Sequence, residues 1–294
     1  MKLVIAPANP AQPNFAGAVS GIDLTQPLAP QQIAAIEAGM ARFAVLAFRN
    51  QALTDDQQIA FTRYFGPLEQ ATGDIVQGEA RRLRMELNDI SNLDRDGQIR
   101  ARDDRARLFG LGNRLWHSDS SFKSTPARFS LLSARVVPAS GGNTEFADMR
   151  AAWDTLDRAT QSEIRDLITH HSQLYSREVL GFPFTETERE KWAPVRQRLV
   201  RRHAETGRLS LYLSAHIGQI EGMPTPEARA LLRDLTEHAT QRERVHAHVW
   251  QKNDLVMWDN RITMHRARPF PADQVRDMRR TTIEDEAPTL QQAA

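Results

Sequence analysis

Two short motifs, far apart in the chain, constrain its fold most strongly. Residues 116–119 are Trp-His-Ser-Asp, and residues 257–265 are Met-Trp-Asp-Asn-Arg-Ile-Thr-Met-His. If His117, Asp119 and His265 bind one metal ion, the fold must bring these distant segments to the same point. Three such ligands on one side of the ion leave about half of an octahedral shell open, the arrangement of non-haem Fe(II) oxygenases.

The spacing of the first motif supports this hypothesis. Side chains two positions apart on a strand face the same side, so we expect His117 and Asp119 on a strand, directed at one ion. His265 follows an apolar, strand-like segment at residues 255–258. Asp259 is a rival carboxylate, but we expect it to cap the turn after that segment.

Other polar residues have simpler interpretations. His246 and His248 form a second His-x-His pair, which is either another metal site or, as we expect, a pair of partly buried sheet residues. Three arginines after His265 suggest an acidic cosubstrate, because a guanidinium offers paired donors to a carboxylate. These arginines are Arg276, Arg279 and Arg280.

Composition excludes several classes of protein. The chain has 294 residues, is 40% hydrophobic and 26% charged, and contains no cysteine, which excludes disulfides, thiolate metal sites and a cysteine nucleophile. A net charge of +1 gives no overall attraction for nucleic acid or an anionic membrane. We therefore expect neither partner, and we expect the basic run of Arg196, Arg198, Arg201 and Arg202 to be a solvated face. Without a signal peptide or an apolar run of roughly 20 residues, we expect a cytoplasmic location.

The pattern of apolar residues predicts a mostly β core with peripheral helices. Alternating or continuous apolar segments predict strands at residues 43–48, 129–137, 245–250, 255–259 and 279–283. Residues 94–114 are charged and lack periodicity, so we expect a mobile loop there. One domain over residues 1–294, with a helical insertion at about 149–205 between the metal-binding segments, is the simplest organisation.

Three segments carry a resemblance to a known family. Leu115–Phe122, Gly141–Ala152 and Leu255–Arg261 resemble the taurine dioxygenase/2,4-dichlorophenoxyacetate dioxygenase family, most closely its phenoxyacetate-type members. The similarity extends over residues 17–282. It implies a double-stranded β-helix (jelly-roll) core, an Fe(2+) centre, and 2-oxoglutarate and O2 as cosubstrates.

The resemblance also implies roles for particular residues. It implies that iron is bound by His117, Asp119 and His265. It assigns the distal carboxylate of 2-oxoglutarate to Thr144 and Arg280, with Arg276 a second arginine of lower rank. On the substrate side it implies Asn113, His216 and the loop from Gln70 to Asp74.

The family resemblance points to an organic acid substrate. Aryloxyalkanoates such as 2,4-dichlorophenoxyacetate are the leading candidate class. Hydroxylation beside the ether oxygen would yield a phenol and glyoxylate, with succinate and CO2 from 2-oxoglutarate. Relatives are commonly homo-oligomers, so we expect one here. The alternatives are a sulfonate or other organic acid as substrate, a zinc or manganese cupin-like hydrolase or isomerase without 2-oxoglutarate, and a non-catalytic binding protein for small acids.

Overall fold

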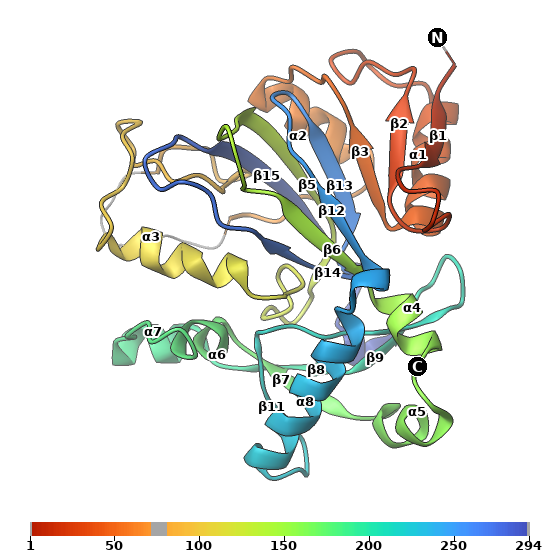
Figure 1. Ribbon diagram of the computed structural model, residues 1–294, viewed down its shortest axis with the longest axis vertical. Coiled ribbons are helices and arrows are strands. Elements are labelled where there is room, and N and C mark those ends of the chain that lie inside the picture. Colours follow the sequence, from red (N-terminus) through yellow and green to blue (C-terminus); the bar gives the residue numbers. More distant parts are fainter. Residues whose placement is uncertain (1, 72–80, 293–294) are drawn as a thin grey trace.

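A seven-stranded sheet forms the centre of the molecule (Figure 1). The computed structural model describes residues 2–71 and 81–292. In spatial order the strands of this main sheet are β1 (Val4–Pro7), β2 (Gly17–Ser20), β3 (Val45–Phe48), β13 (Leu255–Asp259), β5 (Ala127–Val136), β15 (Asp277–Glu284) and β4 (Asn88–Asp89). The β2–β3 pair is parallel, and the other pairs are antiparallel.

A second, three-stranded sheet faces the main one. Its order is β12 (Val245–His248), β6 (Thr144–Asp148) and β14 (Thr263–Ala267). Because strand side chains alternate between faces, Trp258 of β13 and Phe146 of β6 meet between the sheets, with ring centroids 5.5 Å apart. The predicted jelly-roll core is confirmed.

Helices cover the outer faces of both sheets (Figure 1). The alternate residues of β13, Leu255 and Met257, pack with α1 and α2 on the outer face of the main sheet. Met264 of β14 packs with α4 and α8 behind the second sheet. The helices are α1 (Pro30–Phe43), α2 (Asp55–Arg63), α3 (Arg105–Gly110), α4 (Met149–Asp154), α5 (Arg158–Ile164), α6 (Gln173–Glu178), α7 (Glu186–Lys191) and α8 (Thr225–Ala239), with 3-10 turns η1 (Leu111–Arg114), η2 (Arg242–Arg244) and η3 (Thr289–Gln291). In the parts of the chain that the structure describes, no helix is long and apolar enough to cross a membrane.

The prediction of a helical insertion at about residues 149–205 is wrong in part, because this segment also contains strands. Besides α4 to α7, it contains three strands that pair into two small sheets, ordered β11-β7-β8 and β10-β9. Two partner strands lie beyond the predicted insertion, so local periodicity carried no sign of the pairing. The five strands are β7 (Ile168–His171), β8 (Val195–Arg198), β9 (Val200–Arg202), β10 (Leu209–Leu211) and β11 (Ile217–Ile220).

Two further expectations fail in part. The charged segment predicted as a loop contains α3 and η1, and α3 begins at an N-cap, Asp104, whose side chain accepts from the Arg107 backbone. In the basic run, Arg196 is exposed and pairs with Glu221, but Arg201 is buried and pairs with Asp285. Arg201 is therefore part of the interior, and the expectation of a solvated face is wrong for this residue.

Arg150 joins the N-terminal segment to the second layer. Its guanidinium binds both carboxylate oxygens of Asp148, at 2.9 and 3.0 Å. It also donates to the carbonyl oxygens of Ala41 and Arg42 in the last turn of α1, and to that of Asn14. Carbonyls of a last helical turn lack partners within the helix, so this one buried side chain satisfies groups from three segments.

We expect Arg150→Ala to lower the free energy of unfolding by about 3–5 kcal/mol, because it leaves Asp148 buried without its partner. Urea denaturation followed by circular dichroism measures this change. The control is Arg158→Ala on the exposed first turn of α5, which should alter stability by less than about 0.5 kcal/mol. Equal effects of the two substitutions would contradict the structural role of Arg150.

Candidate metal centre

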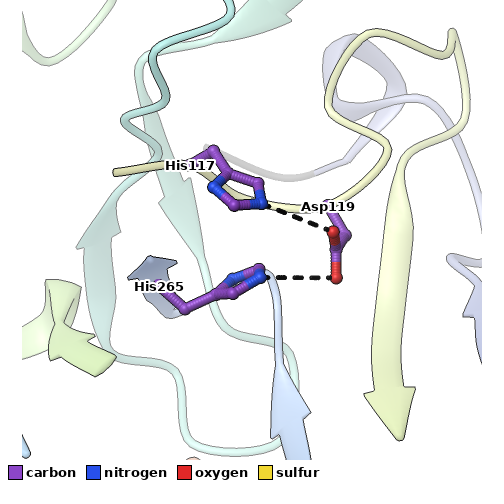
Figure 2. Close-up of side chains that lie close together, drawn as sticks. All are labelled: His117, Asp119 and His265. Atoms are coloured by element: carbon purple, nitrogen blue, oxygen red, sulfur yellow. Dashed lines mark ion pairs between the residues drawn. The ribbon is translucent and has the colours of Figure 1, made fainter. Parts of the chain in front are cut away.

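Three buried side chains meet between the two sheets (Figure 2). Nε2 of His117 lies 3.8 Å from Oδ1 of Asp119, and Nε2 of His265 lies 3.8 Å from Oδ2 of the same carboxylate. The donor atoms all lie within 4.8 Å of one another. The structure thus brings together the three residues that the sequence predicts as metal ligands.

A backbone bridge holds the two histidines together. The N–H of His117 donates to the carbonyl of His265 at 3.0 Å, and the reverse bond is 2.8 Å. Beyond this isolated bridge the chain turns at Asp119 and Ser120, where Ser120 has φ 52°. The expectation of a strand through His117 and Asp119 is therefore wrong, because a turn and not a pleat directs the carboxylate toward the imidazoles.

The hydrogen bonding of His117 fixes its tautomer. Nδ1 lies 2.8 Å from the carbonyl oxygen of Leu115, and a carbonyl only accepts, so Nδ1 carries the proton. The lone pair of Nε2 then points toward Asp119 and His265. Burial lowers the pKa of both imidazoles, that of His265 well below its usual value. Neutral imidazoles are the form that binds a metal.

Asp119 is held ionised and in place by its neighbours. Burial raises its pKa, but the positive charge of Arg280, together with smaller effects of its other neighbours, more than offsets this and lowers the pKa to about 2. Arg280 contacts Oδ1, and Ser130 Oγ donates to Oδ2 at 2.8 Å. The carboxylate therefore stays charged at neutral pH.

Asn260 stabilises the position of Asp119 through hydrogen bonds to its backbone and to Ser130. Its Oδ1 accepts the backbone N–H of Asp119 at 3.1 Å and the indole N–H of Trp258 at 3.0 Å. Its Nδ2 donates to Ser130 Oγ at 2.9 Å. The sequence predicts a turn at Asn260, but no local signal marks its link to Asp119.

The donor set fits a divalent transition metal. Two neutral imidazoles and one carboxylate are the ligands of a facial site. Bonds of roughly 2.1 Å place neighbouring octahedral donors about 3 Å apart, so the donor atoms, which lie within 4.8 Å of one another, need to close by about 1–2 Å. The small cavity described next borders His117 and His265.

A cavity of about 30 Å³ borders the metal ligands and brings the predicted cosubstrate residues together. Thr144, Arg276 and Arg280 all line it. Trp250 Nε1 donates to Thr144 Oγ1 at 2.9 Å, which leaves the threonine hydroxyl free to donate. Arg276 is buried and donates to the carbonyl of Ile90 at 3.1 Å.

Arg276 differs from Arg280 in its charge environment. Burial alone lowers the pKa of Arg276 to about 10, and within residues 2–71 and 81–292 no carboxylate pairs with it. Arg280 instead contacts Asp119. Arg276 is thus a buried cation that lacks a counter-charge beside Thr144.

A larger cavity of about 360 Å³ borders His117 and Asp119 and shares several lining residues with the small one. Asn113 and His216, the predicted substrate residues, both border it. His216 Nδ1 lies 2.9 Å from Ser176 Oγ, and its ring meets Phe122 at 5.0 Å. Most of the predicted substrate loop from Gln70 to Asp74 lies outside the described residues.

The larger cavity is strongly basic. Three acidic side chains border it, namely Glu69, Asp89 and Asp119. Ten arginines border it, namely Arg81, Arg82, Arg95, Arg100, Arg107, Arg114, Arg177, Arg268, Arg276 and Arg280. In a chain of net charge +1, this concentration of cations favours an anionic ligand.

The remaining candidates lie elsewhere. Asp259 binds Arg261 at 2.7 Å and does not belong to the metal-compatible cluster of the described chain. His248 lies on β12 and pairs with Asp254 at 3.0 Å, which agrees with the sheet interpretation of this histidine pair. Arg279 pairs with Asp55 at 2.6 Å, away from both cavities.

Comparisons with known proteins agree with this geometry. The chain is 48% identical over 281 residues to the alpha-ketoglutarate-dependent 2,4-dichlorophenoxyacetate dioxygenase of Cupriavidus pinatubonensis, covering 95% of this chain and 98% of that protein. It is 37% identical to the (S)-phenoxypropionate/alpha-ketoglutarate-dioxygenase of Delftia acidovorans, covering 89% of each. The solved structure of AAD-2 in complex with Mn(II) and N-oxalylglycine matches with a TM-score of 0.90 and 52% identity, over 99% of this chain and 100% of that one.

The family model agrees with the individual relatives. The model described as "Taurine catabolism dioxygenase TauD, TfdA family" matches residues 7–282, a range that contains all three ligands and both arginines of the small cavity. On this match over nearly its whole length, the chain belongs to the TauD/TfdA dioxygenase family.

Proposed function

We propose that this protein is an Fe(II)- and 2-oxoglutarate-dependent dioxygenase that hydroxylates a small organic acid. The observation that carries the proposal is the cluster of His117, Asp119 and His265 beside a buried arginine without a counter-charge. The cluster suits ferrous iron, and Arg276 requires an anion. 2-Oxoglutarate meets both needs, because it has a metal-chelating keto acid at one end and a carboxylate at the other.

Thr144 and Arg276 hold the distal carboxylate of 2-oxoglutarate in this proposal. The guanidinium supplies paired donors, and the free threonine hydroxyl supplies another. This reverses the order of the two arginines that the family resemblance implied. Both arginines border the two cavities, but of these two described residues only Arg280 contacts Asp119, so it is better placed to orient the substrate beside the metal.

When bound, ferrous iron with 2-oxoglutarate and O2 supplies an oxidant that hydroxylates a C–H bond and leaves succinate and CO2. The chain's own residues position the reactants. His117 and His265 stay neutral and Asp119 stays charged, so all three keep their donor atoms available. The bulky rings of Phe146 and Trp258 pack against His265 and exclude water behind the site.

The leading substrate class is an aryloxyalkanoate such as 2,4-dichlorophenoxyacetate. Relatives of 48% and 37% identity carry names with phenoxy acids as substrates. A basic cavity of about 360 Å³ bordered by the aromatic rings of Phe109 and Phe122 suits an aromatic acid. Hydroxylation of the carbon beside the ether oxygen gives a hemiacetal, which breaks down to a phenol and glyoxylate.

The alternatives account for less of the site. A zinc or manganese hydrolase would leave Arg276 buried without a partner, as would a barrel without catalytic activity. A sulfonate or another organic acid as substrate is compatible with the basic cavity, and a substrate screen separates these classes. Anaerobic loading with Fe(II) and 2-oxoglutarate, followed by exposure to air with each candidate acid, should release succinate in proportion to turnover.

A single domain, a cytoplasmic location and a homo-oligomeric assembly complete the proposal. Light scattering after size-exclusion chromatography tests the assembly. A monomer at micromolar concentration would contradict it.

We expect His117→Ala or His265→Ala to abolish binding of the metal, because each substitution removes one of three protein donors. Equilibrium dialysis with Fe(II) under anaerobic conditions measures the stoichiometry. His246→Ala is the matched control, since this histidine lies on β12 outside the cluster. Retention of one metal equivalent by His117→Ala would refute the ligand assignment, and loss of it in His246→Ala would reveal a second site.

We expect Arg276→Lys to raise the KM for 2-oxoglutarate by roughly 10- to 100-fold, because hydrogen bonds to charged groups contribute about 1.5–3 kcal/mol. Arg280→Lys should instead act mainly on the KM for the organic acid. Initial rates with each reactant varied in turn distinguish the two effects. The opposite pattern would return the distal carboxylate to Arg280.

A further inference from the structure

Arg177 on α6 is a buried cation that the proposed chemistry has not used. Its exposed fraction is 4%. Its polar contacts are neutral: Ser176 Oγ at 2.7 Å and a long contact of 3.5 Å to Asn113 Oδ1. Its Nε is buried without an acceptor, and its guanidinium lies 4.7 Å from the centre of the Phe109 ring.

The other buried arginines show what is unusual about Arg177. Across the described residues, the buried arginines are Arg150, Arg177, Arg201, Arg261 and Arg276. Three of them pair with buried carboxylates, namely those of Asp148, Asp285 and Asp259. Arg177 and Arg276 lack such a partner, and both border a cavity beside the metal ligands. A buried charge without a partner costs several kcal/mol, so each of these two positions implies an anion that binds there.

The charge on Arg177 persists at neutral pH. Burial and the positive charge of Arg280 lower its pKa to about 10, which still leaves it protonated. Among the described residues, Asp119 is the one carboxylate whose charge raises the pKa of Arg177. That carboxylate is a proposed metal ligand and already contacts Arg280, so its charge is not available to neutralise Arg177.

The surroundings of Arg177 aim it at the reaction centre. Arg177 and Arg280 border the same cavity as the proposed ligands His117 and Asp119. Gly112 of η1 makes room for the guanidinium, since a Cβ there would lie 2.4 Å from Arg177 Cζ. Asn113, the next residue, borders the same cavity.

We infer that Arg177 binds the acidic group of the organic substrate, together with Arg280, while the aromatic part lies toward Phe109 and Phe122. This inference rests on the proposed function and adds a second guanidinium to its substrate site. The ligand class is an aromatic acid with a single carboxylate or sulfonate. A neutral analogue of the same shape leaves Arg177 uncompensated and therefore binds poorly.

The test compares an acid with its uncharged counterpart. Enzyme loaded anaerobically with Fe(II) and 2-oxoglutarate is titrated calorimetrically with 2,4-dichlorophenoxyacetate and with 2-(2,4-dichlorophenoxy)ethanol. Arg177→Gln should raise the Kd of the acid by roughly 10- to 100-fold and change that of the alcohol by less than about threefold. Metal stoichiometry and 2-oxoglutarate affinity should equal those of the wild type.

Arg105→Gln is the matched control. Arg105 also lies over an aromatic ring of this region, Phe182 at 4.6 Å, but Glu188 balances its charge and it does not line the cavity. The control should bind the acid as the wild type does. If Arg177→Gln does not fold, Arg177→Met takes its place, because its apolar stem can still pack on Phe109.

Three results would overturn the inference: an unchanged Kd for the acid, equal losses for acid and alcohol, or wild-type enzyme that binds both equally well. The last measurement needs no variant. Failure of the proposed function would give a different result: the wild-type enzyme would release no succinate with any organic acid. If the wild type turns over normally and Arg177→Gln binds the acid as tightly as the wild type, the proposed dioxygenase function stands. Only the assignment of Arg177 to the substrate site is then refuted.

Discussion

The pair of backbone hydrogen bonds between His117 and His265 is the constraint on which the site depends. It joins a segment that is otherwise a turn to the edge of β14, and so fixes the separation of two imidazoles before any metal is present. Their side chains then share a direction because they leave the same bridge. Asp119 follows within one turn, where Asn260 and Ser130 hold it. A site built in this way is preorganised by main-chain pairing, which side-chain substitutions nearby disturb little.

The balance of buried charge separates structural arginines from ligand-binding ones. Arg150 and Arg261 are buried with carboxylates of their own chain and hold segments together. Arg177 and Arg276 are buried with neutral partners only, and both border the metal site. The same residue type therefore has opposite meanings at equal burial. What decides between them is whether the protein itself supplies the counter-charge.

The sequence predicted the parts of the site that follow from a motif or an apolar strand. The strand before His265 was predicted correctly from its run of apolar residues, and the jelly-roll core from the family resemblance. The structure also brings together His117, Asp119 and His265, as their spacing suggested. The strand through His117 was wrong, since a single bridge and a turn also place two side chains together.

Long-range pairing and charge balance were beyond the sequence. The strand β7 pairs with β11 on one side and with β8 on the other, and nothing in its own residues signals these partners. Arg177 was not singled out, because its lack of a carboxylate can be seen only when every neighbour is known. The order of Arg276 and Arg280 depends on the same information.

The larger cavity is bordered by both arginines and aromatic rings, and this combination affects how the products are released. Guanidinium groups hold the charged end of an aryloxy acid, and Phe109 and Phe122 border its ring. Ether cleavage divides the molecule between these walls, so that the phenol keeps the ring without the charge and glyoxylate keeps the charge without the ring. Each fragment retains only part of the contacts that bound the whole, and the chemical step itself thereby loosens both products for departure.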